Sequence, residues 1–600
     1  MYEQKLICSA IAFLCTASAA QTAATPAAAA NSAETAPAPR PTAAQALDVQ
    51  ARQRRLEAAE IFLLKSIQEQ TKNDKLTVAD LPKLERVLFV RSPGNAQEVE
   101  ALAARIKAKS EQGLLPAIDV DGFAGLVTPA LQADVGELLG QPYTPALAVE
   151  IQNSVRRALD AAGKPFALLS LAPVDAANRR LIVLIEPARL QSKEVAQAEL
   201  FAAKLYASNL RIEPGQEIDL TSLERDVAFM SKTGYRSAQL VWAAGDKQGT
   251  TKLIVRVNPE KLWDVSANMS NSGTKTTGLN RFGLNAAFGN LWGVGHVIDY
   301  GLTTDSTARR VVSHSVGYVA PLPWNHTLSL STNFTSTNPD VPAPLATPGK
   351  SSSWKLKYAL DLPSSSWLKN QELALALEHK RSDNTTLFSD VPVTNSLYEL
   401  RQWLLQYQGQ AVDSFGATQI GMDLVYSPGS RGVLNSDTNL QAIRADARSR
   451  YSIVQLRLQR QLQLPAEWSW NSAVKLQSAT ENLISSEQLV ISGSSGVRGY
   501  GPGQASADSG WVWRNDWSHA LYSGEALNVR GGVFFDMGSG KERRPTAPDS
   551  DLRKKSAGLG LQAAFGRWNL NLEMGKPLKS SGPAEATKVH TSVQLNRQLF

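Results

Sequence analysis

Apolar and polar residues alternate one by one through most of the chain after Pro259. The pattern is clearest in residues 263–270, 282–288 and 354–361. The apolar members of these runs are Trp263, Val265, Ala267, Met269, Phe282, Leu284, Ala286, Phe288, Trp354, Leu356, Tyr358 and Leu360. Successive side chains of a strand point to opposite faces of a sheet, so a period of two indicates strands with one apolar and one polar face. Residues 259–600 are therefore expected to be all β.

Such strands fit two kinds of structure: a soluble sandwich or propeller with one buried face, and a membrane barrel with an apolar outside and a wet lumen. The start of the chain favours the barrel. An apolar run from Leu6 to Cys15 precedes small residues, which is typical of a secretory signal peptide, and we expect residues 1–20 to be one. No later stretch of about 18 apolar residues could form a membrane helix, and a membrane protein without such helices has to span as a barrel.

Aromatic residues and the number of alternating runs also favour the membrane barrel. Tryptophans recur near the expected strand ends, where the boundary between lipid and water favours aromatic rings, and the chain ends on Phe600. These tryptophans are Trp292, Trp324, Trp367, Trp403, Trp468, Trp517 and Trp568. The runs number about 16, at roughly 21 residues for a strand and its connection, which suits membrane strands of about 9 to 11 residues. A barrel of that size encloses a channel that an extended polypeptide could pass and a folded domain could not.

Composition divides the chain between the signal peptide and the barrel. Residues 21–44 are rich in Ala, Pro and Thr, and we expect them to be a flexible linker. Residues 45–70 carry apolar residues at helical spacing among charged ones, which predicts an amphipathic helix. We interpret residues 71–113 as a linker or a helical extension.

Two α/β units follow in residues 114–258. Residues 114–190 show the order strand, helix, helix, strand, strand, and residues 191–258 repeat it without an obvious opening strand. Small modules of this order resemble the polypeptide-transport-associated (POTRA) domains of barrel-assembly and secretion pores. The resemblance implies two POTRA domains in the periplasm.

Composition argues against several other functions. Both cysteines, Cys8 and Cys15, lie in the expected signal peptide, so the mature chain would have no disulfide, cysteine metal site or thiol nucleophile. The net charge of +7 is dispersed and forms no basic helix, so we expect no nucleic-acid partner. Gly558, Gly560 and Ala563 match a dinucleotide fingerprint on paper, but the following residues alternate as a strand where that site needs a helix. We expect no catalytic residues, no metal and no cofactor, and hence no enzyme.

A first motif near the end of the chain is Val497-Arg498-Gly499-Tyr500. It lies in the Gly-rich segment 481–510, which is too long for a plain hairpin loop. An arginine on an exposed loop, taken alone, is usually only solvated.

The second motif, Phe534, Asp536 and Gly538, lies in an apolar strand some forty residues later. The period of two turns Asp536 away from its neighbours in the sequence and into the lumen. If the loop folds inward, a carboxylate fixed on the wall would attract the guanidinium of Arg498 in bidentate geometry. The two motifs together are far more specific than either one.

Together the motifs resemble those of the two-partner secretion translocators, the haemolysin and filamentous-adhesin secretion/activation family of the POTRA-barrel superfamily. The segment from Glu487 to Gly493 and residues 270–273 after the first barrel strand are also similar. The resemblance implies that residues 45–70 are a plug helix and that residues 259–600 form a 16-stranded antiparallel barrel. It also implies an inward-folded loop whose tip, Arg498, pairs with Asp536.

The function that the resemblance implies is that of a pore in the outer membrane of a Gram-negative bacterium. It would recognise a large unfolded exoprotein through its POTRA domains and secrete it through the lumen without ATP. Its other partners would be outer-membrane lipid and periplasmic chaperones, and the pore itself would be a monomer. Two alternatives stay open: a barrel-assembly insertase of the same superfamily, which usually carries more POTRA units, and a passive porin, which needs neither POTRA domains nor the motif pair. The sequence does not name the cargo among haemolysins, adhesins, haem-binding proteins and toxins.

Overall fold

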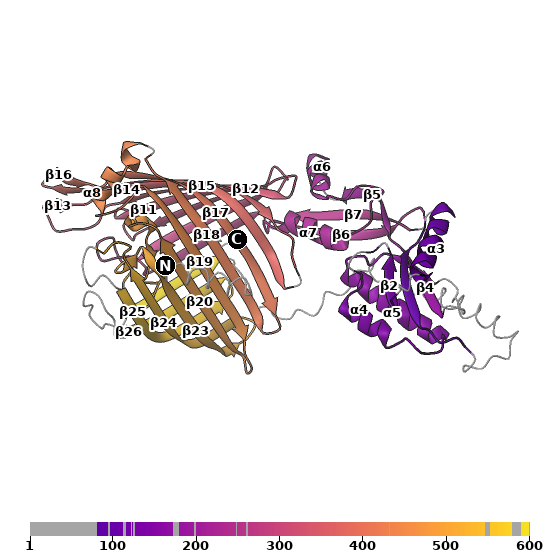
Figure 1. Cartoon of the computed structure of the whole chain (residues 1–600). Helices are drawn as coiled ribbons and strands as arrows, with labels where there is room; N and C mark the ends of the chain where they lie inside the picture. Colours follow the sequence, from indigo (N-terminus) through magenta and orange to yellow (C-terminus); the bar gives the residue numbers. More distant parts are fainter. Residues whose placement is uncertain are drawn as a thin grey trace. The chain divides into compact units, whose positions relative to one another are not determined.

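The computed structural model describes residues 81–598 with some gaps. The gaps are residues 94–95, 112–115, 122, 124–125, 172–178, 197–199, 248, 260–261, 366, 431, 546–551 and 579–589. The expected signal peptide (1–20), linker (21–44) and plug helix (45–70) lie outside the described residues, as does Phe600. The described chain forms an N-terminal unit and a C-terminal unit that begins at Pro259 and includes residues 233–236 (Figure 1). No described helix is long and apolar enough to cross a membrane.

The first module of the N-terminal unit is a four-stranded sheet covered by helices on both faces. Its elements are β1 (Arg86–Arg91), α3 (Ala96–Glu111), β2 (Ile118–Asp121), α4 (Pro129–Gly136), α5 (Pro145–Ala161), β3 (Leu168–Leu171) and β4 (Arg180–Glu186). The strand order is β2-β1-β4-β3, with β1 parallel to both of its neighbours. Phe89 of β1 packs in one core with Ile151 of α5, while Leu88 packs in another with Ile106 of α3. Strand β1 is therefore buried on both faces, which its unbroken apolar run allows.

The structure differs from the sequence expectation for residues 71–113. Residues 86–91 are the central strand β1 of the first sheet, and α3 covers one face of that sheet. A run of four apolar residues, Val87 to Val90, carries no alternation, so periodicity alone could not identify it as a strand.

The second module repeats the order strand, helix, helix, strand, strand that runs from β2 to β4 of the first module, around a smaller sheet. It comprises β5 (Arg189–Ala196), α6 (Leu200–Asn209), α7 (Leu220–Ser231), β6 (Arg236–Ala244) and β7 (Thr250–Pro259), with strand order β5-β7-β6. Strand β5 is the opening strand that the sequence did not reveal, and it crosses the boundary expected after residue 190. Tyr206, Leu223, Met230 and Val255 are in its core.

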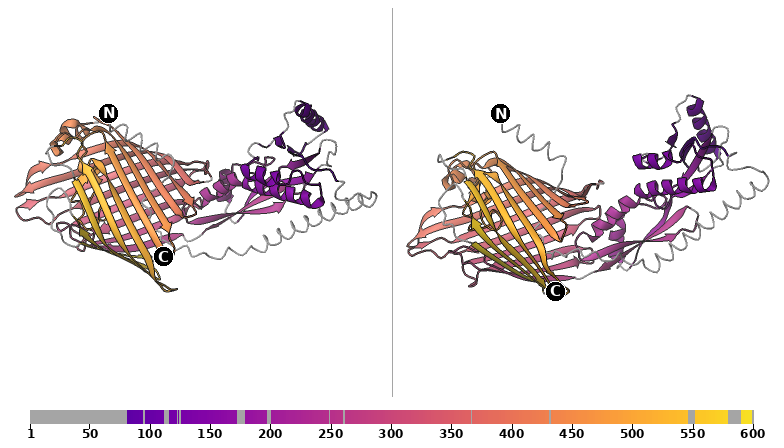
Figure 2. Two further views of the ribbon diagram at one scale, coloured as in Figure 1. Left: turned by 60° about the horizontal axis from the view of Figure 1, so that its bottom comes forward. Right: turned by 90° about the horizontal axis from the view of Figure 1, so that it is seen from below.

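The C-terminal unit is a closed barrel of antiparallel strands. Its wall is formed by β8 (Trp263–Ser270), β9 (Arg281–Leu291), β10 (His296–Thr304), β11 (Val311–Pro321), β12 (His326–Thr337), β14 (Gly349–Asp361), β15 (Leu368–Phe388), β17 (Tyr398–Asp413), β18 (Gly416–Pro428), β19 (Arg450–Gln463), β20 (Trp468–Ala479), β23 (Ser509–Ser523), β24 (Leu527–Lys541), β25 (Leu552–Phe565), β26 (Trp568–Pro577) and β27 (His590–Gln598). The last strand pairs with the first and closes the ring. The expectation of about 16 antiparallel strands is confirmed. Figure 2 shows the strands running obliquely around the wall.

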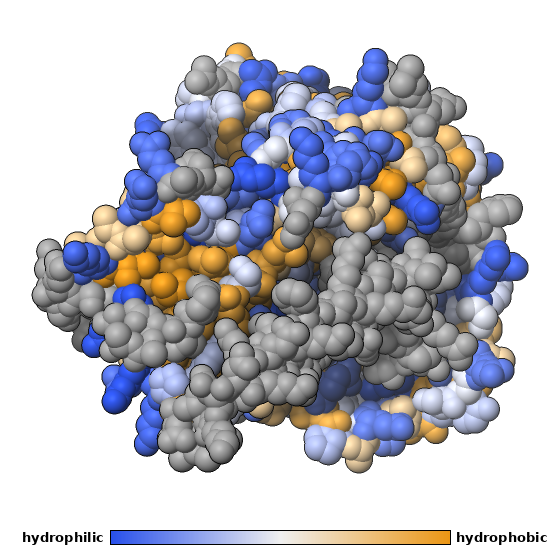
Figure 3. Space-filling model, turned by 90° about the vertical axis from the view of Figure 1, so that its right-hand side faces the viewer, coloured by the Kyte–Doolittle hydropathy of each residue, from blue (hydrophilic) through white to orange (hydrophobic). Residues whose placement is uncertain are grey.

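The barrel wall is apolar outside and polar inside. Large apolar side chains are exposed along alternate positions of the strands, among them Met269, Leu284, Leu330, Leu375, Leu405, Val533 and Leu559. The residues between them point inward and include Lys357, Glu372, Asp423 and Arg457, which form ion pairs across neighbouring strands. This arrangement matches a wall between lipid and a wet lumen. Hydrophobic residues also reach the surface as a patch among hydrophilic ones on the side of the chain shown in Figure 3.

Some connections at one end of the barrel carry structure of their own. Strand β15 extends beyond its neighbours and pairs there with the short strands β13 (Leu345–Ala346) and β16 (Val391–Asn395). The β18–β19 connection holds η2 (Val433–Asn435) and α8 (Asp437–Ile443). The β20–β23 connection holds η3 (Ser485–Glu487), β21 (Leu489–Val490) and β22 (Ser506–Ala507). This last connection, residues 480–508, contains the first motif and is called the inner loop below.

Candidate functional site

The inner loop is held together by a small core of its own. Strands β21 and β22 pair with each other, and Ile491, Val497, Tyr500 and Ala507 are buried together. The backbone N–H of Val497 donates to the carbonyl of Ile491 at 2.7 Å. The loop tip is therefore a folded turn, and it presents Arg498 at a fixed place.

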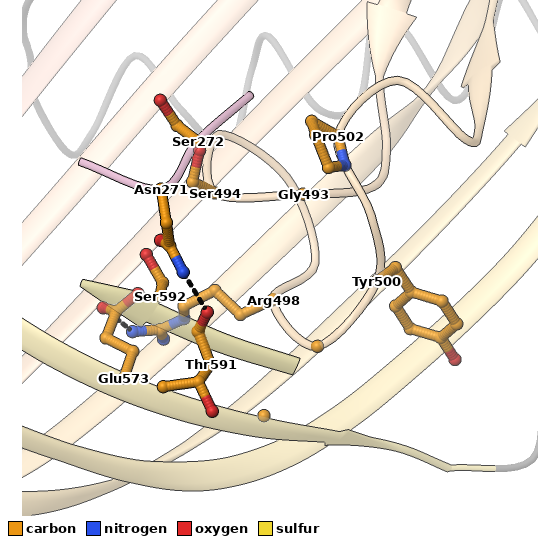
Figure 4. Close-up of a pocket in the computed structure, with 12 residues that line it drawn as sticks. Asn271, Ser272, Gly493, Ser494, Arg498, Tyr500, Pro502, Glu573, Thr591 and Ser592 are labelled. Atoms are coloured by element: carbon orange, nitrogen blue, oxygen red, sulfur yellow. Dashed lines mark hydrogen bonds and ion pairs between the residues drawn. The ribbon is translucent and has the colours of Figure 1, made fainter. Parts of the chain in front are cut away.

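The guanidinium of Arg498 lies among three carboxylates of the barrel wall. Its Nε and Nη2 donate to the two oxygens of Asp536 on β24, both at 2.8 Å. Its Nη1 donates to Asp516 on β23 at 2.6 Å and to Glu573 on β26 at 2.9 Å. The backbone N–H of Arg498 adds a bond to Asp536 at 3.1 Å. Arg498 is 4% exposed and Asp536 is fully buried. The loop tip is ion-paired to three strands of the inner wall, and Figure 4 shows the contact of Arg498 with Glu573. We call the three carboxylates that surround Arg498, those of Asp516, Asp536 and Glu573, the carboxylate cage.

Phe534 completes the cage from one side. The guanidinium carbon of Arg498 lies 3.8 Å from the centroid of the Phe534 ring, within the range of a cation–π contact. A Cβ at Gly558 of β25 would collide with this ring, so a glycine is needed at that position. The second motif thus supplies both the carboxylate and the aromatic face that receive the arginine.

Glycines let the loop tip approach the wall. Gly499 has a φ of 87°, in the left-handed region that favours glycine. A Cβ on Gly575 of β26 would lie 2.7 Å from the Cα of Gly499, and one on Gly538 would lie 3.0 Å from a methyl group of Val497. The backbone of the tip therefore packs directly on the backbone of the wall.

Tyr500 anchors the other side of the tip. Its hydroxyl donates to the carbonyl of Lys555 at 2.9 Å, and the ammonium of Lys554 lies 5.0 Å from its ring centroid. The structure thus brings together all seven residues that the sequence singled out, Val497, Arg498, Gly499, Tyr500, Phe534, Asp536 and Gly538. That the loop tip 497–500 acts as a latch, with Phe534, Asp536 and Gly538 as its partner on the strand, stays a prediction.

A second polar cluster fastens the two ends of the inner loop. Asp508, fully buried, accepts a bond from Arg444 of the β18–β19 connection at 3.0 Å and one from the backbone N–H of Leu483 at 3.0 Å. Burial by itself would raise the pKa of Asp508, but the hydrogen bonds from Arg444 and from backbone N–H groups outweigh it and hold the pKa below its usual range. Near the other end, Glu487 accepts bonds from Lys380 at 2.9 Å and from Gln402 at 2.8 Å.

The loop tip also lies beside the closure of the barrel. Strands β27 and β8 share a short register of five residue pairs. Asn271, which follows β8, extends it: its side-chain amide donates to the carbonyl of Thr591 at 2.7 Å and accepts from the N–H of Val593 at 2.9 Å. Asn271 and Thr591 line the same pocket as Arg498 and Glu573 (Figure 4). The pocket therefore joins the loop tip to the seam between the first and last strands.

Sequence reasoning missed Asp516 and Glu573 of the carboxylate cage. The alternation in β26 could have identified Glu573, because the apolar residues Leu570, Leu572 and Met574 share the outer face of the strand and Glu573 lies on the opposite, luminal face. Asp516 was harder to identify, since the polar residues Asn515 and His519 interrupt the opposite face of its strand, which carries the tryptophans. The segment from Glu487 to Gly493 carries part of the family resemblance, but the partners of Glu487 and Asp508 could not be read from the sequence, because only the fold brings those segments together.

Within the described residues, no group of three His, Cys, Asp or Glu side chains could hold a metal ion. The three acidic groups of the cage are engaged by Arg498 instead. The arrangement offers reversible ion pairing between a loop and a wall, and it offers no nucleophile or acid-base pair.

Comparison with known proteins identifies the family. The model of the haemolysin secretion/activation protein family ShlB/FhaC/HecB matches residues 249–563, more than half of the chain. The chain belongs to this family. It is therefore a two-partner secretion translocator of the outer membrane, and its family is one of transporter proteins and not of enzymes. Membership in this family distinguishes it from the insertase and porin alternatives.

Individual relatives are distant in sequence and similar in fold. The heme/hemopexin transporter protein HuxB of Haemophilus influenzae strain 86-028NP is 22% identical over 423 residues, which cover 66% of this chain and 70% of HuxB. Among solved structures, CdiB from Escherichia coli has a TM-score of 0.67 at 16% identity and covers 91% of this chain and 98% of its own. CdiB from Acinetobacter baumannii has a TM-score of 0.62 at 16% identity, with coverages of 86% and 90%. At these identities the structures show a shared fold.

Proposed function

We propose that this translocator exports one large exoprotein in unfolded form through the barrel lumen without ATP, and that the inner loop is the gate. The carboxylate cage would hold the loop against the wall at rest. Export would require the tip to leave the cage. Folding of the cargo outside the cell would then make the transport directional.

The observation that carries this proposal is the way in which the loop tip is attached. Its polar contacts to the wall are ion pairs and hydrogen bonds, and its closest packing is against glycines: the backbone of Gly499 lies on Gly575, and a methyl group of Val497 lies on Gly538. Such contacts can break and re-form without any change in covalent bonds. In a wet lumen, water partly solvates the charged groups when they separate. A loop fastened in this way is suited to move, whereas a loop interlocked by large side chains would not be.

We further propose that cargo binds by adding a strand to an open sheet edge of a POTRA domain. The second sheet has the order β5-β7-β6, so its two edge strands are β5 and β6, of eight and nine residues. These strands are twice as long as β2 and β3, the edges of the first sheet, with four residues each. Longer edges offer more backbone groups to an extended peptide, which is the basis of recognition by strand addition.

Secretion by variants of the cage tests the gate. Arg498→Ala and Asp536→Ala should each reduce secretion of the cognate exoprotein in cells while the barrel still inserts in the outer membrane. Arg530→Ala is a matched control, because Arg530 also lies on β24 and bonds to Ser469 at 2.8 Å on a different part of the wall. If both cage variants secrete as well as the control, the inner loop is not the gate.

A further inference from the structure

We propose that Arg514 is a reserve counter-ion that neutralises the carboxylate cage when Arg498 leaves it. This inference rests on the proposed function, since it concerns the state in which the loop has moved. Arg514 lies on β23 and belongs to neither of the two sequence motifs.

The position of Arg514 places it next to the cage from the start. Its Cα pairs across the strands with that of Asp536, a register in which side chains on one face are neighbours. Its Nη2 lies 3.9 Å from Glu573, and Asp516 is two residues away on the same face of β23. Arg514 therefore needs no movement of the backbone to approach the three carboxylates.

The present partner of Arg514 belongs to the loop that has to move. Its Nη1 donates to the carbonyl of Ser494, four residues before Arg498, at 2.7 Å. When the tip withdraws, it removes Arg498 from the cage and the Ser494 carbonyl from Arg514 in the same motion. Withdrawal of the tip thus leaves the carboxylates without Arg498 and at the same time frees the guanidinium of Arg514 to bind them.

The charges of the cage make such a replacement necessary. Asp516, Asp536 and Glu573 face Arg498 within 2.9 Å, and Asp536 is fully buried. Without Arg498, three like charges would lie close together on the wall, and Arg514 is the cation that the strand register sets directly opposite one of them. A fixed guanidinium on a neighbouring strand can form two parallel bonds to a carboxylate, which water does not replace at equal strength.

A second luminal cation contacts the loop but is not placed in this way. Lys475 of β20 donates to the carbonyl of Ser495 at 3.2 Å. Its Cα pairs with that of Val512, whereas Arg514 pairs with Ala473 on that side and with Asp536 on the other. Lys475 and Arg514 thus contact neighbouring carbonyls of the inner loop, whereas Arg514 is in register with a carboxylate of the cage and Lys475 is not.

The test is a double-mutant cycle on the purified full-length protein, read as the rate of barrel unfolding in detergent. Arg498→Ala imitates withdrawal of the tip, and Arg514→Gln keeps a donor for the Ser494 carbonyl but removes the charge. We expect the double variant to unfold about tenfold or more faster than the product of the two single effects, as coupled charges do. Arg514→Lys, which keeps the charge, should remove most of this excess, and so should Asp536→Asn added to the double variant.

Two controls separate charge replacement from general damage. Arg498→Ala combined with Arg530→Gln should show no excess, because Arg530 contacts Ser469 away from the cage. If the Arg498→Ala, Arg514→Gln variant gives no folded barrel, the versions with Arg514→Lys or with Asp536→Asn should recover it. Simple multiplication of the single effects, or no recovery in either version, would overturn the proposal. The assay contains no cargo, so normal secretion by Arg498→Ala would contradict the gate while leaving this coupling to be judged on its own result.

Discussion

Removing the guanidinium of Arg498 should release the tip of the inner loop. The side chain makes four contacts of 2.6 to 2.9 Å to three carboxylates, and its backbone N–H makes a fifth. Hydrogen bonds to charged groups contribute about 1.5 to 3 kcal/mol each in buried sites. Breaking one partner of a buried ion pair costs about 3 to 5 kcal/mol in total. We take the lower end, about 3 kcal/mol, because the Asp516 side chain is 36% exposed and the lumen is wet.

That free energy can be read as a change in accessibility. At about 1.4 kcal/mol per factor of ten, a loss of 3 kcal/mol raises the population of the displaced tip roughly 100-fold. Val497 is fully buried when the tip is in place, and the chain has no cysteine after Cys15. A cysteine introduced by Val497→Cys is therefore a specific reporter, and its labelling by a water-soluble maleimide measures how often the tip leaves the wall.

We expect labelling of Val497→Cys to be slow alone, about 100-fold faster with Arg498→Ala, and intermediate with Arg498→Lys. Lysine keeps the charge, but it presents a single point of contact where arginine presents a fork. The control Arg530→Ala should leave the labelling rate near that of Val497→Cys alone. Equal rates with Arg498→Ala and Arg530→Ala would refute the reasoning, since the ion pairs would then contribute nothing to the position of the tip.

Further predictions concern the contacts around the cage. Gly575→Val should displace the tip, because even a Cβ at this position would lie 2.7 Å from the Cα of Gly499. Conductance in planar bilayers should then rise. Unchanged conductance would show that strand β26 can shift to make room for the side chain. Asn271→Ala should lower the temperature at which the folded barrel is lost on gels by several degrees, since it removes two bonds across the seam; an equal effect of Ser270→Ala would argue against a special role. Asp508 should make the loop ends acid-sensitive: its lowered pKa contributes stability that is present above the unfolded value of about 3.9 and is lost as the pH falls through the folded value. Channel noise should therefore increase below about pH 4, and Asp508→Asn should show that noise already at pH 6. Deletion of residues 81–258 should abolish export while leaving an inserted pore, and retained export would place cargo recognition in the barrel.

The barrel could be predicted from the sequence because its wall repeats one physical rule. Each strand separates lipid from water, so apolar and polar residues alternate in strand after strand from residue 263 onward. This alternation predicted that the side chain of Asp536 faces the lumen. The pairing of Arg498 with Asp536 could be anticipated only from the two motifs taken together, since nothing local shows that a loop folds inward.

Other parts of the fold leave no such pattern. Strand β1 is buried on both faces and has only four apolar residues in a row, which fit a helix as well as a strand. Strand β5 mixes charged and apolar residues because it lies at the edge of its sheet. Asp508 and Arg444 come from different connections, and their pairing depends on the folding of both.

The glycines under the loop tip have a consequence for how the barrel is built. Gly538 and Gly540 of β24 and Gly575 of β26 carry no side chains, and the inner loop fills the space beside them with Ile491, Val497 and the backbone of Gly499; at Gly558 of β25 the space is taken by Phe534 of the wall itself. In a barrel without the inner loop, water would contact the strand backbones there. The glycines would also weaken the strands, because glycine loses more conformational entropy on folding than other residues. The inner loop thus supplies packing that these strands lack, so we expect a barrel without the inner loop to fold more slowly and to be less stable.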